Sequence, residues 1–325
     1  MKKILFLIIL IFALTGCTSY TELNDLSIVN TLGIDYIDNN YLLTLTTIER
    51  DNENDKINTF SSKKESLDKA INNIYLTSNK KIYLSHIDLL IITPDVINNK
   101  LDELLNNFLK SNEYRNNFQV IIMNKEDMNT FFNNGISSKE ITNLIDINSR
   151  ETSIVYKKEL EEFIKEILID NNSYLPTISF KNNTINLVGY TIIKNKKTYN
   201  TLSIKDSIIL NIFEHKANNL NINDINIYHT DIRTKTNKNK IYFEIYLTTD
   251  TDNKKKISTL KKDMMLFLEK YRDEDVDILK LQELIRKNHY SYYKKNNDLL
   301  SKLKFKIKII NKKQNDYFSG GNYEK

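Results

Sequence analysis

Apolar and polar residues near the start of the chain follow the period of two that is typical of β-strands. Residues 27–37 and 41–48 are rich in β-branched and apolar side chains, and the turn-forming residues Asp38, Asn39 and Asn40 separate them. This pattern predicts a β-hairpin. The following stretch, Glu49 to Lys64, is mostly polar and predicts a loop that leads into a helix.

Helical periodicity then alternates with short β-prone runs. Residues 67–75 place their apolar side chains on one stripe of a helix, and residues 82–92 form a β-prone run that ends at Thr93-Pro94. Asp95 is the predicted N-cap of a helix that continues to Phe108, and residues 118–123 predict another strand. Strands that alternate with helices favour a sheet with helices packed on it.

Three helices are predicted between Lys125 and Asp170. Phe131 and Phe132 lie near the end of the first, residues 141–145 mark the second, and an apolar stripe from Tyr156 to Leu168 marks the third. Asn171-Asn172-Ser173 and Pro176 interrupt this pattern, which predicts a domain boundary nearby.

The second half of the chain repeats the mixture of strands and helices. Its predicted elements are a strand at 187–193, a helix around 208–213, an antiparallel pair at 225–233 and 240–248, helices at 257–271 and 278–285, and a last strand from Lys302 to Ile310. In the last strand lysines alternate with apolar residues, so one face is expected in the core and the other in water.

These patterns predict an α+β fold with mixed or antiparallel sheets and packed helices in two or three domains. The expected segments are a signal peptide at 1–16, a lipidated N-terminus and linker at 17–26, an N-terminal α/β region at 27–180, a C-terminal α+β domain at 181–312 and a flexible tail at 313–325.

The N-terminus has the pattern of an export signal. Lys2 and Lys3 precede eleven apolar residues, Ile4 to Leu14, and small residues lead to Cys17. A membrane-spanning helix needs about 20 apolar residues, so this run predicts a secretory signal and not a span. No later stretch reaches spanning length.

Cys17 is the single cysteine of the chain, and the segment Leu14-Thr15-Gly16-Cys17 resembles a bacterial lipobox. We therefore expect cleavage after Gly16 and an acylated Cys17 that anchors the chain in membrane lipid, since two or more acyl chains give stable attachment. An ordinary signal peptide with an incidental cysteine is the alternative. Disulfides and cysteine-based metal sites are excluded in either case.

Charge and composition argue against further classes of function. The formal net charge is +5, and removal of Lys2 and Lys3 with the leader would lower it to +3. A nucleic-acid-binding protein would concentrate a larger excess on one face, so we expect no nucleic-acid partner. Only six glycines are present, which leaves little material for phosphate-binding loops.

Candidate catalytic or metal-binding groups are few. His229 and Asp231 share one strand face and would be the best ligand-binding pair, although an ordinary surface pair explains the same spacing. His86 and Asp88 have this spacing inside an apolar strand. The acidic stretch 273–277 lacks the central glycine of an EF-hand loop and reads as a solvated connection. We therefore expect no catalytic residue, no metal and no cofactor, and hence no enzyme.

Two interpretations are possible for the lysines of the last strand, Lys302 to Lys308. Lysines on a strand commonly form a solvated face that discourages aggregation. Contact with lipid headgroups or with a protein partner is the alternative.

An ordered set of short motifs resembles the C-subunit lipoproteins of bacterial spore germinant receptors. The opening motif Glu22-Leu23-Asn24-Asp25 is followed by Leu32-Gly33-Ile34-Asp35. Further matching segments are Ile82–Asp88, Glu151–Ser153, Gly189-Tyr190, Lys280–Tyr293 and Lys302–Ile310. One departure is Thr18-Ser19, which stand where the family often has Trp-Asp after the cysteine.

The resemblance implies a lipid-anchored, non-catalytic subunit that is needed for nutrient-triggered spore germination. It implies integral-membrane A and B subunits as partners and the outer face of the spore inner membrane as the location. Cys17 carries over as the lipidation site, whereas Glu22, Leu23, Asn24 and Asp25 carry over as a motif without an assigned role. The alternatives are a solute-binding lipoprotein of a transporter and an exported hydrolase.

Overall fold

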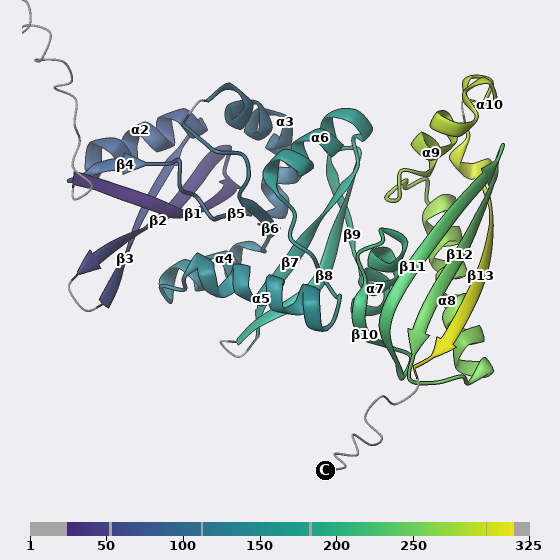
Figure 1. Cartoon of the computed structure of the whole chain (residues 1–325). Coiled ribbons are helices and arrows are strands. Elements are labelled where there is room, and N and C mark those ends of the chain that lie inside the picture. Colours follow the sequence, from purple (N-terminus) through teal and green to yellow (C-terminus); the bar gives the residue numbers. More distant parts are fainter. Residues whose placement is uncertain (1–24, 52–53, 112, 182–183, 297, 315–325) are drawn as a thin grey trace, which may run out of the picture.

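The computed structural model describes residues 25–51, 54–111, 113–181, 184–296 and 298–314. The predicted signal peptide, Cys17 and three motif residues, Glu22, Leu23 and Asn24, lie outside these ranges, as does most of the predicted tail. The described chain forms two β-sheets with helices packed on them, arranged side by side in an elongated body (Figure 1). The predicted α+β class is confirmed.

The first sheet has nine strands in the order β3-β2-β1-β5-β6-β7-β8-β9, and β4 pairs with β1 beside this path. The strands are β1 (Leu26–Ile37), β2 (Asn40–Asp51), β3 (Asn54–Lys64), β4 (Lys81–Tyr83), β5 (Leu89–Ile92), β6 (Gln119–Ile122), β7 (Ser173–Lys181), β8 (Thr184–Lys194) and β9 (Lys197–Thr201). The sheet is mixed, because β1, β5, β6 and β7 run parallel while the hairpins at both ends are antiparallel.

The second sheet has four strands in the order β10-β11-β12-β13. They are β10 (Asn218–Ile222), β11 (Ile225–Asn237), β12 (Lys240–Thr249) and β13 (Lys304–Lys313). The predicted antiparallel pair of β11 and β12 is confirmed, and β13 adds to β12 in parallel.

Helices cover both faces of the first sheet. They are α2 (Leu67–Thr77), α3 (Pro94–Lys110) and α6 (Leu160–Asp170) on one face, and α4 (Lys125–Asn133) and α5 (Ser138–Glu151) on the other (Figure 1). The four consecutive buried residues of β5 divide between the two cores: Leu90 and Ile92 pack with the first group of helices, and Leu89 and Ile91 with the second. A strand covered on both faces is apolar throughout, which is why its sequence shows no alternation.

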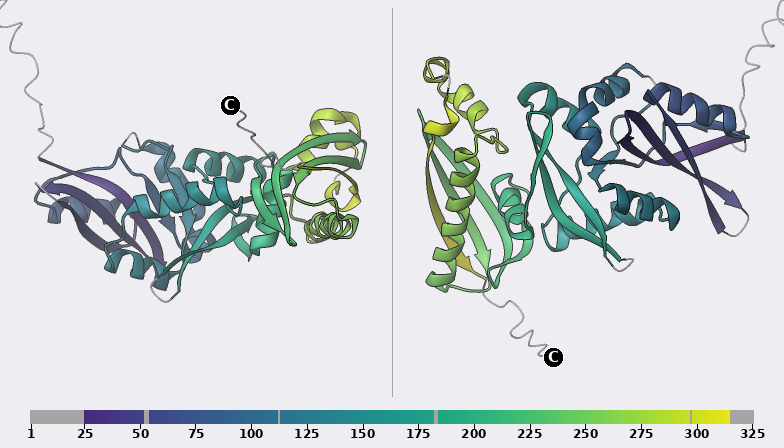
Figure 2. Two further views of the ribbon diagram at one scale, coloured as in Figure 1. Left: turned by 60° about the horizontal axis from the view of Figure 1, so that its bottom comes forward. Right: turned by 180° about the vertical axis from the view of Figure 1, so that it is seen from behind.

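The core on the side of α4 and α5 continues into the second sheet. It includes Tyr190 of β8, Ile209 of α7 (Ile204–Phe213) and Ile245 of β12. The long helix α8 (Lys254–Asp273) covers one face of the second sheet, and the shorter α9 (Leu281–Asn288) and α10 (Tyr290–Lys294) lie near one end of it (Figure 2). The predicted boundary between residues 180 and 181 falls at the end of β7, which pairs with β8; the division into domains stays a prediction.

Residues 54–64, predicted as a loop, form β3 instead. Among the described strands, β3 pairs only with β2 at the edge of the sheet, and its residues Lys56, Thr59, Ser61 and Lys63 are exposed. Its inward side chains include Phe60, which packs on the core, and the buried Ser62, while the exposed Ser61 hydroxyl lies 2.8 Å from the hydroxyl of Thr44. The two apolar residues of the strand, Ile57 and Phe60, are three positions apart and therefore give no period of two.

The predicted strand at 82–92 is two strands separated by a turn. β4 pairs with the beginning of β1, and β5 pairs with β1 beyond a register shift between Val29 and Thr31. Leu84 and Ile87 in the connection are buried, so the apolar run continues through the turn and hides it. The prediction of one strand was therefore wrong.

Asp95 is not the N-cap of α3. Thr93 occupies that position in an extended conformation, and Pro94 is the first helical residue. Proline disfavours helical geometry in the residue before it, which places the helix start at Pro94. The Thr93 hydroxyl donates to Asp35 Oδ1 at 2.6 Å instead of capping the helix.

Candidate functional site

The predicted lipidation site and the described body are close along the chain. Nine residue steps separate Cys17 from Leu26, the first residue of β1. A fully extended chain covers about 3.6 Å per residue, so Leu26 lies within about 32 Å of the Cys17 Cα. Asp25, the last residue of the predicted motif, directly precedes β1 and is exposed.

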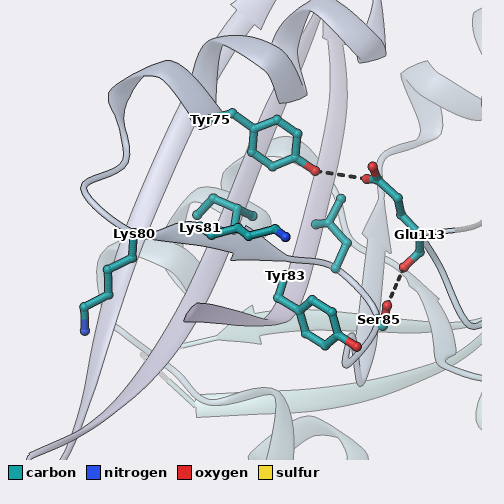
Figure 3. Close-up of a pocket in the computed structure, with 8 residues that line it drawn as sticks. Tyr75, Lys80, Lys81, Tyr83, Ser85 and Glu113 are labelled. Carbon is teal, nitrogen blue, oxygen red and sulfur yellow. Dashed lines mark hydrogen bonds between the residues drawn. The ribbon is translucent and has the colours of Figure 1, made fainter. Parts of the chain in front are cut away.

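The beginning of β1 lies beside a pocket of about 530 Å³. Leu26 pairs with Lys81 and Ser27 with Ile82 of β4, and β4 forms one wall of the pocket. Tyr75 of α2 and Glu113, in the connection between α3 and β6, form other parts of the wall (Figure 3). The pocket is therefore at the end of the body from which the chain leads toward Cys17.

Hydrogen bonds hold the two sides of the pocket together. The Tyr75 hydroxyl donates to Glu113 Oε2 at 3.0 Å, and the Ser85 hydroxyl donates to the Glu113 carbonyl oxygen at 2.8 Å (Figure 3). Burial, together with the neighbouring Glu113 carboxylate, raises the pKa of Tyr75 above its usual value, so this hydroxyl stays a donor. Next to Glu113, the Tyr114 ring packs edge-on against Phe108 at 4.8 Å and fixes the connection to α3.

The pocket presents groups suited to recognition. Lys81 is exposed and extends between Tyr75 and Tyr83, and Ile82 and Leu84 supply buried apolar surface (Figure 3). Within the part of the chain that the structure describes, β4 pairs with β1 alone. A strand paired on one side offers backbone donors and acceptors on the other, which is the arrangement that binds an extended peptide segment.

Asp35, part of the second matching motif, has a structural position. Its side chain is fully buried, and Oδ1 accepts hydrogen bonds from the Thr93 hydroxyl and, at 2.8 Å, from the Tyr36 backbone N–H. Asp35 therefore ties the middle of the first sheet to the start of α3.

The histidine pairs do not form a site. His229 and Asp231 are exposed on β11, and Asp231 Oδ2 lies 4.0 Å from Arg233 Nε. His86 packs against the Tyr83 ring at 5.6 Å, while Asp88 accepts from the Ser138 hydroxyl at 3.3 Å. Among the described residues no group of three His, Cys, Asp or Glu side chains could hold a metal ion.

The lysines of the last strand are placed largely as predicted. Lys304, Lys306 and Lys308 are exposed on β13, while Leu303 and Ile307 are buried. Lys302 is an exception, because it ends a short 3₁₀ turn before the strand. In the acidic stretch 273–277, the Asp277 carboxylate accepts hydrogen bonds from the backbone N–H groups of Leu281 and Gln282 at the start of α9.

Two groups of residues were missed at the sequence level. Tyr75 belongs to the stripe of α2 and was read as core, and nothing in the sequence brings it to Glu113, 38 positions later. Lys158, Glu162 and Glu166 form a second group, in which the Lys158 ammonium lies 2.9 Å from each carboxylate. Their spacing of four residues was a usable signal for this ion pair.

In the described part of the chain, no helix combines the length and the apolar character that crossing a membrane requires.

Comparisons with known proteins relate the chain to spore germination proteins. Residues 19–180 match the sequence model of a family described as the spore germination protein N-terminal domain. The chain is 21% identical over 175 residues to spore germination protein KC of Bacillus subtilis (strain 168), a match that covers 48% of this chain and 43% of that protein. The alignment thus spans less than half of the length of this curated relative.

A solved structure shares the fold. The crystal structure of the GerBC protein matches with a TM-score of 0.54 over 87% of this chain and 97% of that chain, at 17% sequence identity.

Proposed function

Because this chain belongs to the C-subunit family of bacterial spore germinant receptors, we propose that it is the lipid-anchored, non-catalytic subunit of such a receptor. In this role it assembles with integral-membrane A and B subunits on the outer face of the spore inner membrane. It contributes to nutrient-triggered germination through binding and not through catalysis.

The observation that carries the proposal is the match of residues 19–180 to the spore germination domain, combined with the fold shared over most of the chain. The matched region contains the β4 pocket and begins two residues after Cys17. The part of the chain that defines the family is thus the part next to the proposed anchor.

The anchor is the acylated Cys17. A charged start, an apolar run of signal length and a lipobox-like exit support acylation. The linker of nine residue steps keeps the β4 pocket within a few tens of ångströms of the lipid surface.

Partner binding uses the β4 pocket. An extracytoplasmic segment of an integral-membrane subunit emerges at the membrane surface, where the short linker holds this end of the body. An extended segment could add to the free side of β4 and place side chains against Tyr75 and Tyr83.

The test is affinity capture of the tagged chain from spore membranes. We expect two multi-spanning proteins to be recovered with it. Mass spectrometry should show that the unmodified chain begins at an acylated Cys17, whereas the Cys17→Ala variant should carry no acyl mass and should slow germination. Thr18→Ala, one position further, is the matched control and should behave as the unmodified chain. Capture without any multi-spanning protein would contradict the assembly, and an unmodified chain that begins at another residue and carries no acyl group would contradict the anchor.

A further inference from the structure

One face of the second sheet is covered by α8, and the other is open. The register of β11, β12 and β13 places fifteen residues on the open face, which we call the β11–β13 face. These residues are His229, Asp231, Arg233, Lys235 and Asn237 of β11, Lys240, Tyr242, Glu244, Tyr246 and Thr248 of β12, and Lys304, Lys306, Lys308, Ile310 and Lys312 of β13.

The β11–β13 face holds the net charge of the whole chain. Seven of the 47 basic residues and two of the 42 acidic residues lie on it, which gives +5, the formal charge of the chain. All other residues together balance at 40 of each sign. The excess positive charge is therefore concentrated on one face. The small net charge of the whole chain does not exclude a polyanionic partner at this face.

The acidic side chains on this face already have basic neighbours. Glu244 lies 3.3 Å from Lys308 and 3.8 Å from Lys235, and Asp231 is 4.0 Å from Arg233. Within the described ranges no ion pair involves Lys240, Lys304, Lys306 or Lys312 (all four side chains are exposed). Four ammonium groups thus remain available for an external anion.

The shape of the face is that of a shallow plate. β12 is ten residues long, which corresponds to about 33 Å, and three strands at about 4.8 Å spacing add roughly 10 Å of width. Tyr242 and Tyr246 are half-buried between the charged rows, and the Arg233 guanidinium stacks over the Tyr246 ring at 4.9 Å. α8 lies behind the sheet in Figure 1 and in front of it in the reverse view of Figure 2, so no helix of the described ranges covers this side.

We propose that the β11–β13 face docks on a bilayer surface that contains anionic phospholipid. A sheet face with rows of lysines, and with no described helix protruding from it, matches a lipid surface better than it matches a nucleic-acid groove. Tyrosines among the lysines suit the headgroup region, where aromatic rings with a polar tip are favoured.

This inference rests on the proposed location at a membrane and adds an orientation to it. The β11–β13 face and the beginning of β1 lie at opposite ends of the elongated body in both views of Figure 2. Attachment through acyl chains at one end and lysines at the other would lay the body along the membrane. Each contact raises the local concentration of the other, so the two together bind more tightly than either alone.

The experiment uses the full chain with Cys17→Ala, so that acylation plays no part. Sedimentation with vesicles of phosphatidylglycerol and phosphatidylcholine, mixed one to two, is compared with sedimentation with phosphatidylcholine alone. The uncleaved leader binds both kinds of vesicle, so the ratio of the two partition coefficients isolates the electrostatic preference. Each lysine near an anionic surface contributes about fivefold to partitioning. We expect a strong preference for the anionic vesicles that falls as salt is raised.

Two variants and a control locate the effect. Changing Lys304, Lys306 and Lys312 to Gln should lower the preference about 100-fold, and changing them to Glu should abolish it. Neither variant breaks an ion pair among the described residues, and thermal melts check that both fold. The control changes Lys255, Lys261 and Lys262 to Glu; these are exposed lysines of α8, on the covered side of the sheet.

The outcomes separate the alternatives. An unchanged preference in the Gln variant, or an equal loss in the α8 control, would overturn the proposal. It would also be overturned if duplex DNA bound in a Lys304-, Lys306- and Lys312-dependent manner while the vesicles did not. Vesicle binding and the capture of multi-spanning partners are separate measurements. A chain without a vesicle preference can still recover both partners, so failure of this inference is distinguishable from failure of the proposed receptor role.

Discussion

Lys280 Nζ lies 2.9 Å from Glu166 Oε1, so the N-cap residue of α9 forms an ion pair with a buried carboxylate of α6, 114 positions earlier. The same carboxylate lies 2.9 Å from the buried ammonium of Lys158 and accepts from the Ser173 hydroxyl at 2.6 Å. Burial alone would raise the pKa of Glu166, but Lys158, Ser173 and Lys280 outweigh it and hold the pKa below its usual value. This pairing joins the part of the chain that carries the family domain to the C-terminal part.

Glu166→Gln should destabilise the fold by about 3–5 kcal/mol. The change leaves Lys158 charged and buried, with the Tyr174 ring 4.3 Å away and with the half-exposed Glu162 as its remaining carboxylate among the described residues. Urea unfolding at neutral pH measures the loss. Lys280→Met is the control, because Lys280 is 38% exposed and its removal leaves the Lys158–Glu166 pair intact; it should cost about 1 kcal/mol or less. Equal costs for both changes would contradict a buried charge centred on Glu166.

Gly33→Ala should destabilise the first sheet by about 1–3 kcal/mol. A Cβ atom at Gly33 would lie 2.4 Å from Cε2 of the Phe132 ring and 3.2 Å from the Met128 sulfur. Phe132→Leu should make room and recover part of the loss in the double variant, which a double-mutant cycle by urea unfolding measures.

Gly189→Ala provides the comparison for that cycle. Its Cβ would lie 2.6 Å from both the Leu202 carbonyl oxygen and the Ser207 hydroxyl oxygen, and its φ of +137° is one that residues with a side chain rarely adopt. Ser207→Ala removes only the side-chain contact, and because the backbone atom and the backbone angle still conflict with a Cβ, it should not rescue Gly189→Ala. Strictly additive effects of Gly33→Ala and Phe132→Leu would mean that the ring does not restrict position 33.

The elements that could be predicted are those with a clear pattern in their own sequence. The elements that were missed depend on contacts with segments that are distant in the sequence. The β1–β2 hairpin was predictable because Asp38 and Asn39 adopt positive φ angles of 50° and 60°, which short polar residues tolerate. β3 was not, because an edge strand with a polar face has no hydrophobic period. The turn at Leu84 to Ile87 was hidden because its apolar residues are buried as those of a strand would be.

In the candidate site, too, one part could be predicted from local sequence and another could not. Cys17 is recognisable from local sequence alone, since a lipobox is a linear pattern. The β4 pocket is not, because Tyr75, Lys81 and Glu113 meet only through the packing of α2 and β4 against the connection that follows α3. The charge of the β11–β13 face was visible only in part, since the pairing of β13 with β12 places its lysines beside those of β11 and β12.

Stability should rise as pH falls from 8 to 5, and Asp277 should be responsible for part of this rise. Burial raises the pKa of Asp277 to about 6 from an ordinary 3.8, against the opposing effect of the Gln282 and Leu281 N–H groups. The folded state therefore binds this proton more tightly than the unfolded state. The contribution of Asp277 protonation to the free energy of unfolding is complete below about pH 3.8 and is lost as pH rises through about 6. It amounts to at most about 3 kcal/mol.

Urea unfolding at several pH values between 5 and 8 tests this dependence. Asp277→Asn should flatten the profile, whatever its effect on absolute stability through the cap of α9. Asp263→Asn is the matched control: burial would raise the pKa of Asp263, but Lys205 and Asn223 hold it below 3.8, outside this window. An Asp277→Asn profile as steep as that of the unmodified chain would assign the titration to another group.

Lys81→Glu should weaken partner capture without affecting the fold. Lys81 is exposed at the β4 pocket, and its change removes the cation that lies between Tyr75 and Tyr83 (Figure 3). Exposed substitutions of this kind usually alter the free energy of unfolding by about 0.5 kcal/mol or less. If an extracytoplasmic segment of a multi-spanning subunit adds to β4, the reversed charge should reduce co-capture from spore membranes several-fold. Lys165→Glu on α6 is the control, with the same change in charge at an exposed helix position away from the pocket. Because both variants keep Cys17, they should be retained equally in the membrane fraction. A selective loss of partners in Lys81→Glu would assign the contact to the β4 pocket. Equal recovery of partners by both variants would exclude the pocket as the contact.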